Sequence, residues 1–249
     1  MKLYENERID RLYSNEVGII QSADVFSFSL DAVLLASFTS GLRKKEGRLV
    51  DLCAGNGAVG LFLTKKVTGQ IIGVEVQDRL ADMAKRSIEL NDLEDRVQIL
   101  NIDLDKATEF IKEDSVDIVT CNPPYFSNLP TSKKNDNPYL AIARHEISVN
   151  LERIIEVASD LLKMNGKAYF IHRPERAAEI FELMRKHRLA PKKVQLVHPK
   201  AGKEANMILI EAIKDGRPNG IRFMPAIIVY KDSDEYTPLL REILYGKSE

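Results

Sequence analysis

Short apolar segments alternate with amphipathic segments along most of the chain from residue 48 onward. The apolar segments predict β-strands over 48–52, 70–76, 97–102, 116–121 and 167–172. The segments between and after them predict helices over 58–67, 79–91, 106–112, 151–164 and 175–187. Regular alternation of this kind is typical of an α/β fold, in which helices cover both faces of a parallel sheet.

The pattern changes near the end of the chain. Two strand-like segments, 193–198 and 206–212, follow one another without a helix and predict an antiparallel hairpin at the edge of the sheet. We therefore expect a Rossmann-like, mostly parallel sheet of seven strands. We expect a single domain over 1–249 with three parts: an N-terminal lead-in over 1–47, a core over 48–212 and a C-terminal extension over 213–249.

The lead-in predicts a hairpin over 9–21 and a helix from about Asp31. Within the core, the connection from 122 to 149 is long for a compact domain. Loops beyond about 15 residues are usually functional or disordered. We expect this one to act as a lid that becomes ordered when a substrate binds.

Composition excludes several classes of protein. The net charge is −1, so nucleic acid would have to be bound by a local patch. The beginning of the chain lacks an apolar signal core, and the most apolar early stretch, 25–42, is interrupted by Asp31. We expect a cytoplasmic protein without membrane contact. Cys53 and Cys121 are expected to be reduced and buried, and the histidines and cysteines show no metal-ligand spacing, so no metal is expected.

A glycine-rich loop follows the first strand of the core. Gly55, Gly57 and Gly60 form a GxGxxG pattern that opens a helix, and such glycines permit a tight turn and close approach of backbone to a ligand. The pattern alone is weak evidence for a nucleotide site. Asp51 makes it more specific, because a carboxylate four residues before the first glycine would repel a pyrophosphate and suit a cationic ligand.

Two more carboxylates come at the ends of the next strands. Glu75, 20 residues after Gly55, is placed to accept both hydroxyls of an adenosine ribose, and Asp103 is placed to accept from an adenine amine. Each acid alone could be a solvated strand end or a helix cap. Together they describe a pocket for an adenosine that carries a positive centre, which fits S-adenosylmethionine better than NAD.

The strand over 116–121 ends in Asn122-Pro123-Pro124-Tyr125. Proline restricts itself and the residue before it, so this turn holds the Asn122 side-chain oxygen and the Pro123 carbonyl in fixed positions. Two such acceptors could bind the hydrogens of an exocyclic amine and free its lone pair toward a methyl group. Tyr125 offers a face on which a base can stack. A proline-rich strand terminator is the structural alternative.

Several segments resemble one family. The sequences DLCAGNGAVG, VEVQ and NPPY, in this order and spacing, resemble class I S-adenosylmethionine-dependent methyltransferases that modify planar amine nitrogens. The chain further resembles the bacterial tRNA adenine-N6 methyltransferases that act on the anticodon loop of valine tRNA. That likeness extends over FSFSLDAVLLASF (26–38), NPPYF, ARHE (143–146), LVHPKAGKEANMILIEA (196–212), and RFMPAIIVY with EYTPLLREIL (222–244).

The resemblance implies roles for individual residues. Asn122, Pro123, Pro124 and Tyr125 would form the catalytic clamp. The cofactor would be held by Asp51, Cys53, Ala54, Gly55, Gly57, Glu75, Val76, Asp103 and Leu104. Phe28, Ser29 and Asp31 would close over its methionine end, although helix capping explains Ser29 and Asp31 equally well.

Basic residues gather in one part of the chain. Residues 185–203 contain seven Lys or Arg and no Asp or Glu. We expect the RNA substrate, a tRNA, to bind there and along the long connection through Phe126, Lys133, Lys134, Arg144, Lys192, Lys193, Lys200 and Lys203. A solvated charged face is the alternative. An unpaired anticodon-loop base would be easy to swing into a pocket.

Other functions share some of these motifs. NPPY also occurs in enzymes acting on DNA adenine, rRNA guanine or a protein glutamine, so it specifies the reaction better than the substrate. A non-catalytic RNA-binding module on the same fold is a further alternative. An NAD-dependent dehydrogenase would use the glycine loop but would leave the Asn122 turn unexplained.

Overall fold

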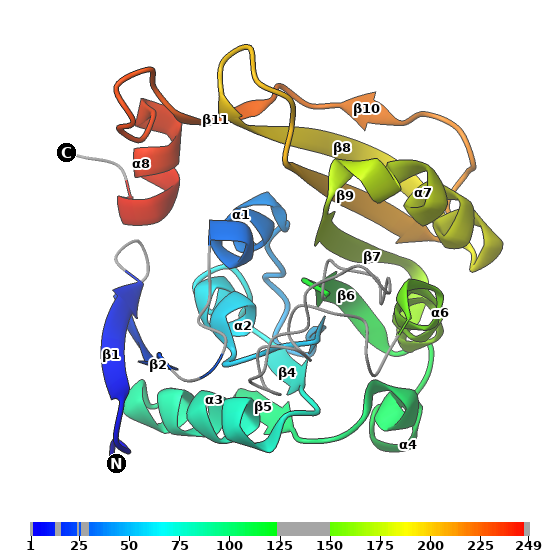
Figure 1. Cartoon of the computed structure of the whole chain (residues 1–249). Helices are drawn as coiled ribbons and strands as arrows, with labels where there is room; N and C mark the ends of the chain where they lie inside the picture. Colours follow the sequence, from blue (N-terminus) through cyan, green and yellow to red (C-terminus); the bar gives the residue numbers. More distant parts are fainter. Residues whose placement is uncertain (1, 13–15, 24, 26–29, 124–149, 247–249) are drawn as a thin grey trace, which may run out of the picture.

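The computed structural model describes residues 2–12, 16–23, 25, 30–123 and 150–246. Its centre is a nine-stranded sheet (Figure 1). Seven strands form its main part: β3 Arg48–Leu52, β4 Gln70–Val74, β5 Val97–Leu100, β6 Val116–Cys121, β7 Leu162–His172, β8 Leu189–Lys200 and β9 Met207–Lys214. Two short strands, β10 Arg222–Phe223 and β11 Ile227–Tyr230, pair with β8.

The strand order is β10-β8-β9-β7-β6-β3-β4-β5, with β11 also on β8. Strands β3, β4, β5, β6 and β7 are parallel to one another, and β9 is antiparallel to both β7 and β8. The expected seven-stranded, mostly parallel sheet with an antiparallel hairpin is confirmed. The two short outer strands were not predicted, because segments of two and four residues carry too few positions to show a period.

Helices cover both faces of the sheet (Figure 1). One face packs against α1 Leu30–Phe38, α2 Ala58–Leu63, α3 Asp78–Leu90 and α8 Pro238–Tyr245. The other packs against η1 Leu104–Lys106, α4 Ala107–Phe110, α6 Leu151–Leu161 and α7 Ala177–Lys186, which η2 Pro174–Arg176 precedes. Alternate residues of β3 divide between the faces: Leu49 belongs to the first core and Val50 to the second.

Some expected boundaries differ from the structure. Helix α2 ends at Leu63, four residues earlier than expected, where the Thr64 hydroxyl bonds the Leu61 carbonyl. Strand β7 begins at Leu162, five residues earlier, because Leu162 already pairs with Val116 ahead of a bulge. The helix α6 therefore ends at Leu161 instead of continuing to Met164.

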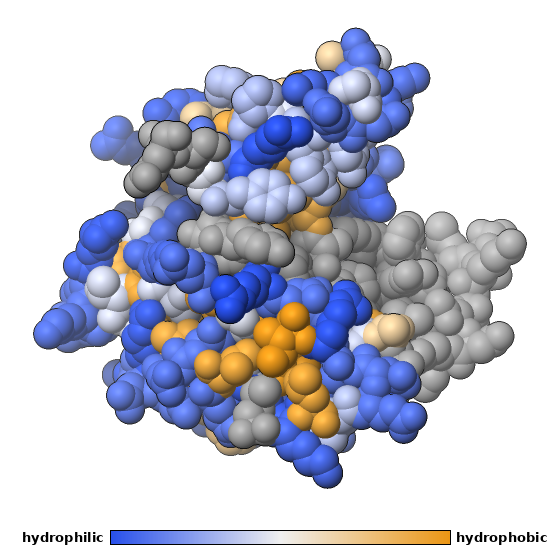
Figure 2. Space-filling view, turned by 90° about the vertical axis from the view of Figure 1, so that its left-hand side faces the viewer, coloured by the Kyte–Doolittle hydropathy of each residue, from blue (hydrophilic) through white to orange (hydrophobic). Residues whose placement is uncertain are grey.

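The N-terminal part forms a separate hairpin of β1 Glu7–Leu12 and β2 Val17–Ser22. It packs on α3, where the Ile20 amide donates to the Ser87 hydroxyl at 2.9 Å. Figure 2 looks onto the side of the molecule that carries β1 and shows an apolar area among mostly hydrophilic side chains. Leu3 and Ile9, at this end of the chain, are 38% and 42% exposed.

The register of the sheet aligns a row of polar residues across the first face. Asp51, Thr120, Tyr169, Glu211 and Lys193 are successive Cα partners on β3, β6, β7, β9 and β8. The first four are at most 3% exposed. The row lies one residue before the paired ends of β3 and β6, so it runs directly beneath the edge where a ligand of an α/β sheet binds.

Candidate active site

The glycine loop and the Asn122 turn meet at one edge of the sheet. Leu52 and Cys121 are Cα partners at the ends of the neighbouring strands β3 and β6. Cys53 and Asn122 each follow one residue beyond this pair. These two strands are neighbours, and the strand order reverses between them. Asn122 is half-buried and Pro123 is buried.

Part of the expected site lies outside the described residues. These residues are Phe28, Ser29, Pro124, Tyr125, Phe126, Lys133, Lys134 and Arg144. The expected lid over 122–149 falls almost wholly in the same part of the chain. The expectations for these residues therefore remain predictions.

The glycine loop contains three residues with left-handed backbone. Cys53, Gly55 and Gly57 have φ of 56°, 57° and 82°. A Cβ at Gly55 would have no atom within 4 Å, whereas one at Gly57 would lie 3.2 Å from the Ala84 Cβ. Gly55 thus leaves the loop open toward a ligand, and Gly57 allows close packing on α3. The left-handed Cys53 was not predicted; strained residues of this kind cluster at ligand sites.

The carboxylate of Glu75 ties the end of β4 to the glycine loop. Its Oε2 accepts from the Gly55 amide and its Oε1 from the Gln77 amide, each at 2.8 Å. Burial raises the pKa of Glu75, and the backbone hydrogen bonds oppose that rise. A carboxylate offers about four acceptor positions. The Val76 amide is a third backbone donor to this carboxylate, so about one acceptor position remains for a ligand.

Asp51 is the most deeply buried acid of the site, at 1% exposure. Its Oδ1 accepts from the Thr120 hydroxyl at 2.7 Å, and its Oδ2 has no hydrogen-bond partner among the described residues. Burial raises the pKa of Asp51 to about 7; the Thr120 hydrogen bond opposes the rise and the charge of Glu75 adds to it. Neither acid forms an ion pair within the described part of the chain.

The remaining cofactor candidates surround this core. Val76 is 40% exposed beside Glu75, and Leu104 is buried at 4%. Asp103 is half-buried, and its Oδ1 accepts from the Asp105 amide at 2.9 Å. Asp31, at the start of α1, is 5% exposed and accepts from the Ala32 amide at 2.8 Å. Asp31 is the second residue of α1, within its first turn, so its roles in cofactor binding and in helix capping both remain predictions.

Three further polar residues support this site, and the sequence analysis did not predict them. Thr120 holds Asp51, and the Asn56 side chain donates to the Ile20 carbonyl at 3.1 Å, which fastens the glycine loop to β2. The side-chain amide of Asn101 donates to the backbone carbonyls of Glu75 and Val76 at 3.0 and 3.3 Å. Only Thr120 carried a signal: it is a hydroxyl in an otherwise apolar strand end, two residues before Asn122.

These features fit S-adenosylmethionine. Asp51 and Glu75 are buried carboxylates without ion pairs among the described residues, which suits a cationic ligand. The Oδ2 of Asp51 also has no hydrogen-bond partner among them. The open space at Gly55 admits a ligand close to backbone, and the exposed Val76 offers an apolar surface beside the acceptors of Glu75. Bound there, the cofactor would supply an electrophilic methyl group on sulfur.

The described basic residues of the proposed RNA surface have different surroundings. Lys192 donates to the carbonyls of Arg217 and Asn219, and Lys193 pairs with the buried Glu211 at 2.9 Å. Lys200 pairs with the exposed Asp234 at 2.7 Å. Lys203 lies exposed in the turn between β8 and β9. The register places Lys200 and Lys203 beyond the carboxyl edge of the sheet, and Lys193 within it.

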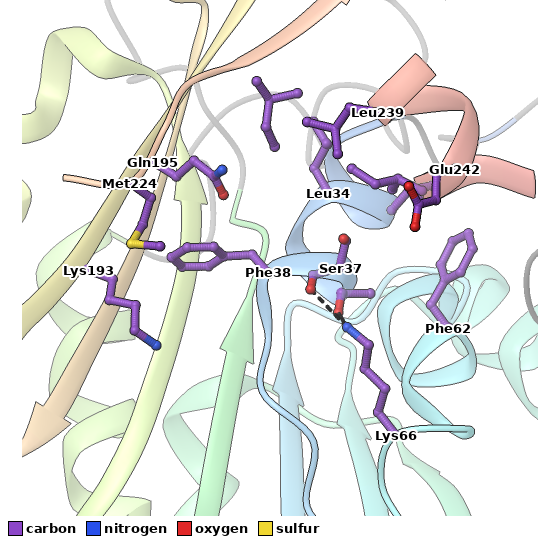
Figure 3. A pocket seen from close by; sticks show the side chains of 14 residues that line it. Leu34, Ser37, Phe38, Phe62, Lys66, Lys193, Gln195, Met224, Leu239 and Glu242 are labelled. Carbon is purple, nitrogen blue, oxygen red and sulfur yellow. Dashed lines mark hydrogen bonds between the residues drawn. The ribbon is translucent and has the colours of Figure 1, made fainter. Parts of the chain in front are cut away.

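A separate cavity of about 590 Å³ lies between α1, β8 and α8 (Figure 3). Its walls include Phe38, Met224 and Leu239, and Lys193 reaches its rim. The Lys66 ammonium at this cavity donates to the carbonyls of Ala36, Ser37 and Thr39, so it caps α1. Among the residues that the structure describes, none from the glycine loop or the Asn122 turn lines this space.

None of the helices that the structure describes has the length and apolar character needed to cross a bilayer. The described residues also contain no group of three or more His, Cys, Asp or Glu side chains placed to hold a metal ion.

Comparison with known proteins supports the same conclusion as the geometry. Residues 16–193 match the model of the methyltransferase small domain. The chain is 26% identical over 218 residues to the tRNA1(Val) (adenine(37)-N6)-methyltransferase of Bacteroides fragilis, covering 85% of this chain and 88% of the relative. The protein of the same name from Shewanella halifaxensis is 27% identical over 143 residues, covering 57% and 56%.

Solved structures share the fold. A predicted O-methyltransferase from Agrobacterium tumefaciens superposes with a TM-score of 0.68 at 25% identity, covering 88% of this chain and 97% of that one. P. horikoshii TYW2 in complex with MeSAdo superposes with a TM-score of 0.60 at 15% identity, covering 86% and 73%. The chain therefore belongs to the methyltransferase small domain family and is an enzyme that uses S-adenosylmethionine as its methyl donor.

Proposed function

We propose that this enzyme methylates the exocyclic N6 amine of an adenine in the anticodon loop of a tRNA, with valine tRNA as the first candidate. The position of Asn122 carries the proposal. It follows β6 directly beside the start of the glycine loop, one residue beyond the Leu52–Cys121 pair. The names of the relatives support the choice of a tRNA adenine over other planar amines.

Asn122 and Pro123 would act on the amine that is methylated. An adenine amine is a poor nucleophile, because its lone pair is delocalised into the ring. The Asn122 Oδ1 and the Pro123 carbonyl would accept hydrogen bonds from the two N–H groups of the amine. Both bonds would favour a pyramidal nitrogen. Fixed acceptors of this kind stabilise the transition state without reorganising. The methylated amine then loses a proton to water, so no strong base is needed.

The proposed cofactor residues would divide the remaining work. Glu75 would accept hydrogen bonds from the ribose hydroxyls, and Asp103 would accept one from the adenine amine. Gly55 would allow close approach of the methionine part, and Asp51 would supply negative charge beneath the loop. Orientation of two reactants can contribute roughly 7–11 kcal/mol to a barrier, so positioning alone could account for most of the rate.

The RNA would be bound along the carboxyl edge of the sheet. Lys200 at the end of β8 and Lys203 in the following turn lie beyond that edge. The ion pair of Lys200 with the exposed Asp234 is of the kind that contributes about 0–1 kcal/mol, so a phosphate can replace it at little cost. Lys193 instead holds the buried Glu211. We therefore assign the phosphate contacts to Lys200 and Lys203 before Lys192 and Lys193.

Nucleoside mass spectrometry tests the proposal. Valine tRNA from a strain that lacks this protein should lack one N6-methyladenosine in its anticodon loop. The wild-type gene should restore it and an Asn122→Ala gene should not. An unchanged tRNA, with methyl transfer instead to rRNA, DNA or a protein glutamine in the presence of purified enzyme, would reject the substrate. Failure to bind S-adenosylmethionine would favour a non-catalytic RNA-binding module.

A further inference from the structure

Thr120 and Asp51 form a buried pair beneath the glycine loop. They are Cα partners on adjacent parallel strands, and both side chains lie on the same face. Thr120 is 0% exposed and Asp51 is 1% exposed. The hydroxyl donates to Oδ1 at 2.7 Å. A hydrogen bond donated to a carboxylate stabilises its ionised form.

The other groups around Asp51 make ionisation harder. Glu75, at the end of β4, is a second buried carboxylate, and its charge raises the pKa of Asp51. The thiols of Cys53 in the loop and Cys121 on β6 contact one another. Burial is the main cause that raises the pKa of Cys121, and Cys53 and the charge of Asp51 add to the rise. From α2, the backbone amide of Gly60 opposes the rise in the Asp51 pKa. No described lysine, arginine or histidine forms an ion pair with Asp51.

The two hydrogen-bonding positions of Asp51 therefore differ. Oδ1 is fixed by Thr120, while Oδ2 is buried without a partner among the described residues. Ala54, Gly57 and Gly60 line the small space of about 10 Å³ next to Asp51, directly under the loop. Little solvent separates a charge at this depth from a ligand on the loop, so the electrostatic interaction between them is strong.

We propose that Thr120 is a positioning residue that keeps Asp51 ionised under the loop, and that this charge makes the site prefer its cationic methyl donor to the neutral product. The donor and S-adenosylhomocysteine differ by one methyl group and one positive charge on sulfur. A neutral Asp51 would bind the two nearly alike. An ionised Asp51 would favour the donor and hasten exchange of product. The proposal concerns the cofactor alone and does not depend on the identity of the RNA.

Equilibrium binding measures this directly. Calorimetry would give Kd for S-adenosylmethionine and for S-adenosylhomocysteine between pH 6 and 8.5 in the wild type. The ratio of product Kd to donor Kd should rise several-fold, with a midpoint near neutral pH. Donor binding at pH 7 should also release protons, seen as a dependence of the binding heat on buffer ionisation enthalpy. A ratio that is flat across this range overturns the proposal without any variant.

Three variants separate charge from packing. Thr120→Val keeps the shape and removes the hydroxyl, so the midpoint of the ratio should move by at least one pH unit upward. Thr120→Ser keeps the hydroxyl and should follow the wild type. Asp51→Asn should give a low ratio at every pH. A Thr120→Val profile that matches the wild type, or a Thr120→Ser profile that matches Thr120→Val, overturns the role of Thr120.

Folding of the variants is checked independently. Far-UV circular dichroism and thermal melts would show whether each variant is folded at the pH of measurement. If Thr120→Val does not fold, the infrared carboxyl band of ligand-free protein decides the point. The band of the wild type minus Asp51→Asn should titrate near neutral pH, and the same difference in a Thr120→Ser background should titrate alongside it. A carboxyl band that stays protonated up to pH 8.5 in both would reject the proposal, because Asp51 would then carry no charge under the loop.

Discussion

The Gly55 amide nitrogen donates to Oε2 of Glu75 at 2.8 Å, and this bond joins the glycine loop after β3 to the end of β4. The same carboxylate accepts from the Gln77 amide, at the start of α3. One buried side chain therefore orients the loop and the following helix together. The geometry of a cofactor site on this edge depends on both strands, although only one of them carries the glycines.

Gly55 supplies the first prediction. With φ at 57°, an alanine would be strained by roughly 1–2 kcal/mol, and its Cβ would project into the open space above the loop. We expect Gly55→Ala to weaken S-adenosylmethionine binding at least tenfold in calorimetry. Gly220→Ala is the matched control, because Gly220 has φ of 90° and a Cβ there also meets nothing within 4 Å. Equal cofactor affinity in the two variants would contradict an open ligand site at Gly55.

Asn122 supplies the second. Asn122→Ala should reduce methyl transfer by at least about 10²–10³-fold, because one fixed acceptor is removed, while the cofactor Kd stays within a few-fold. Asn150→Ala is the control: its side chain caps α6 by accepting from the Arg153 amide at 2.8 Å, far along the chain from the turn. That variant should lose about 1 kcal/mol of stability and keep its activity. Loss of cofactor binding in Asn122→Ala would assign Asn122 a different role.

The pKa of Asp51 makes stability depend on pH. The folded pKa is about 7 against an ordinary 3.8, so between these values the unfolded state ionises and the folded state keeps its proton. The contribution of Asp51 to stability is therefore present below about pH 4 and is lost as the pH rises toward 7. We expect Asp51→Asn to be about as stable as the wild type near pH 4 and more stable by roughly 4 kcal/mol near pH 8. Urea unfolding at several pH values measures the difference, and a constant difference would contradict the raised pKa.

RNA binding can be tested with lysines of one strand and its turn. The double variant Lys200→Ala with Lys203→Ala should weaken tRNA binding and reduce the slope of log K against log salt by about 2. Lys192→Ala should change that slope little, since its ammonium donates to the carbonyls of Arg217 and Asn219. Filter binding over a range of salt gives both slopes. Equal slopes in the two variants would remove Lys200 and Lys203 from the proposed surface.

Charge reversal at Lys193 is a stability experiment. Lys193 and Tyr169 both donate to Glu211, which is 3% exposed. Burial raises the pKa of Glu211, and these hydrogen bonds more than offset it, so the pKa lies below its usual value. A glutamate at 193 would place two carboxylates together and leave the buried Glu211 with the more distant Lys167, at 4.0 Å, so we expect a cost of about 3–5 kcal/mol. Lys193→Glu should lower the melting temperature markedly, and an unchanged melt would show that Glu211 is satisfied by other groups.

The sequence was sufficient for the main sheet and for the edge at which the site lies. Apolar runs such as Val116–Cys121 are long enough to show their type, and their alternation with helices fixes a parallel order. Helix and strand ends were less predictable. Leu162 is an apolar residue that fits the helical pattern before it. It belongs to a strand because it pairs with Val116 on β6.

Within the site, the sequence identified residues by type but not by partner. Asp51, Gly55 and Glu75 were recognisable from their spacing. The contact between Thr120 and Asp51 was not, since the two residues are 69 positions apart and meet only through the pairing of β3 with β6. The pairing of Lys193 with Glu211 was hidden for the same reason, so a basic stretch in the sequence included a lysine that serves the core.

The two short strands β10 and β11 have a consequence for synthesis of the chain. Both pair with β8, whose backbone would otherwise present unpaired amides and carbonyls along one side. Exposed edges of this kind recruit strands from other molecules. Residues 222–230 emerge from the ribosome after β8 and β9, so a nascent chain carries an open flank until they arrive. Truncation ahead of Arg222 should therefore yield a protein that self-associates even when its catalytic centre is intact.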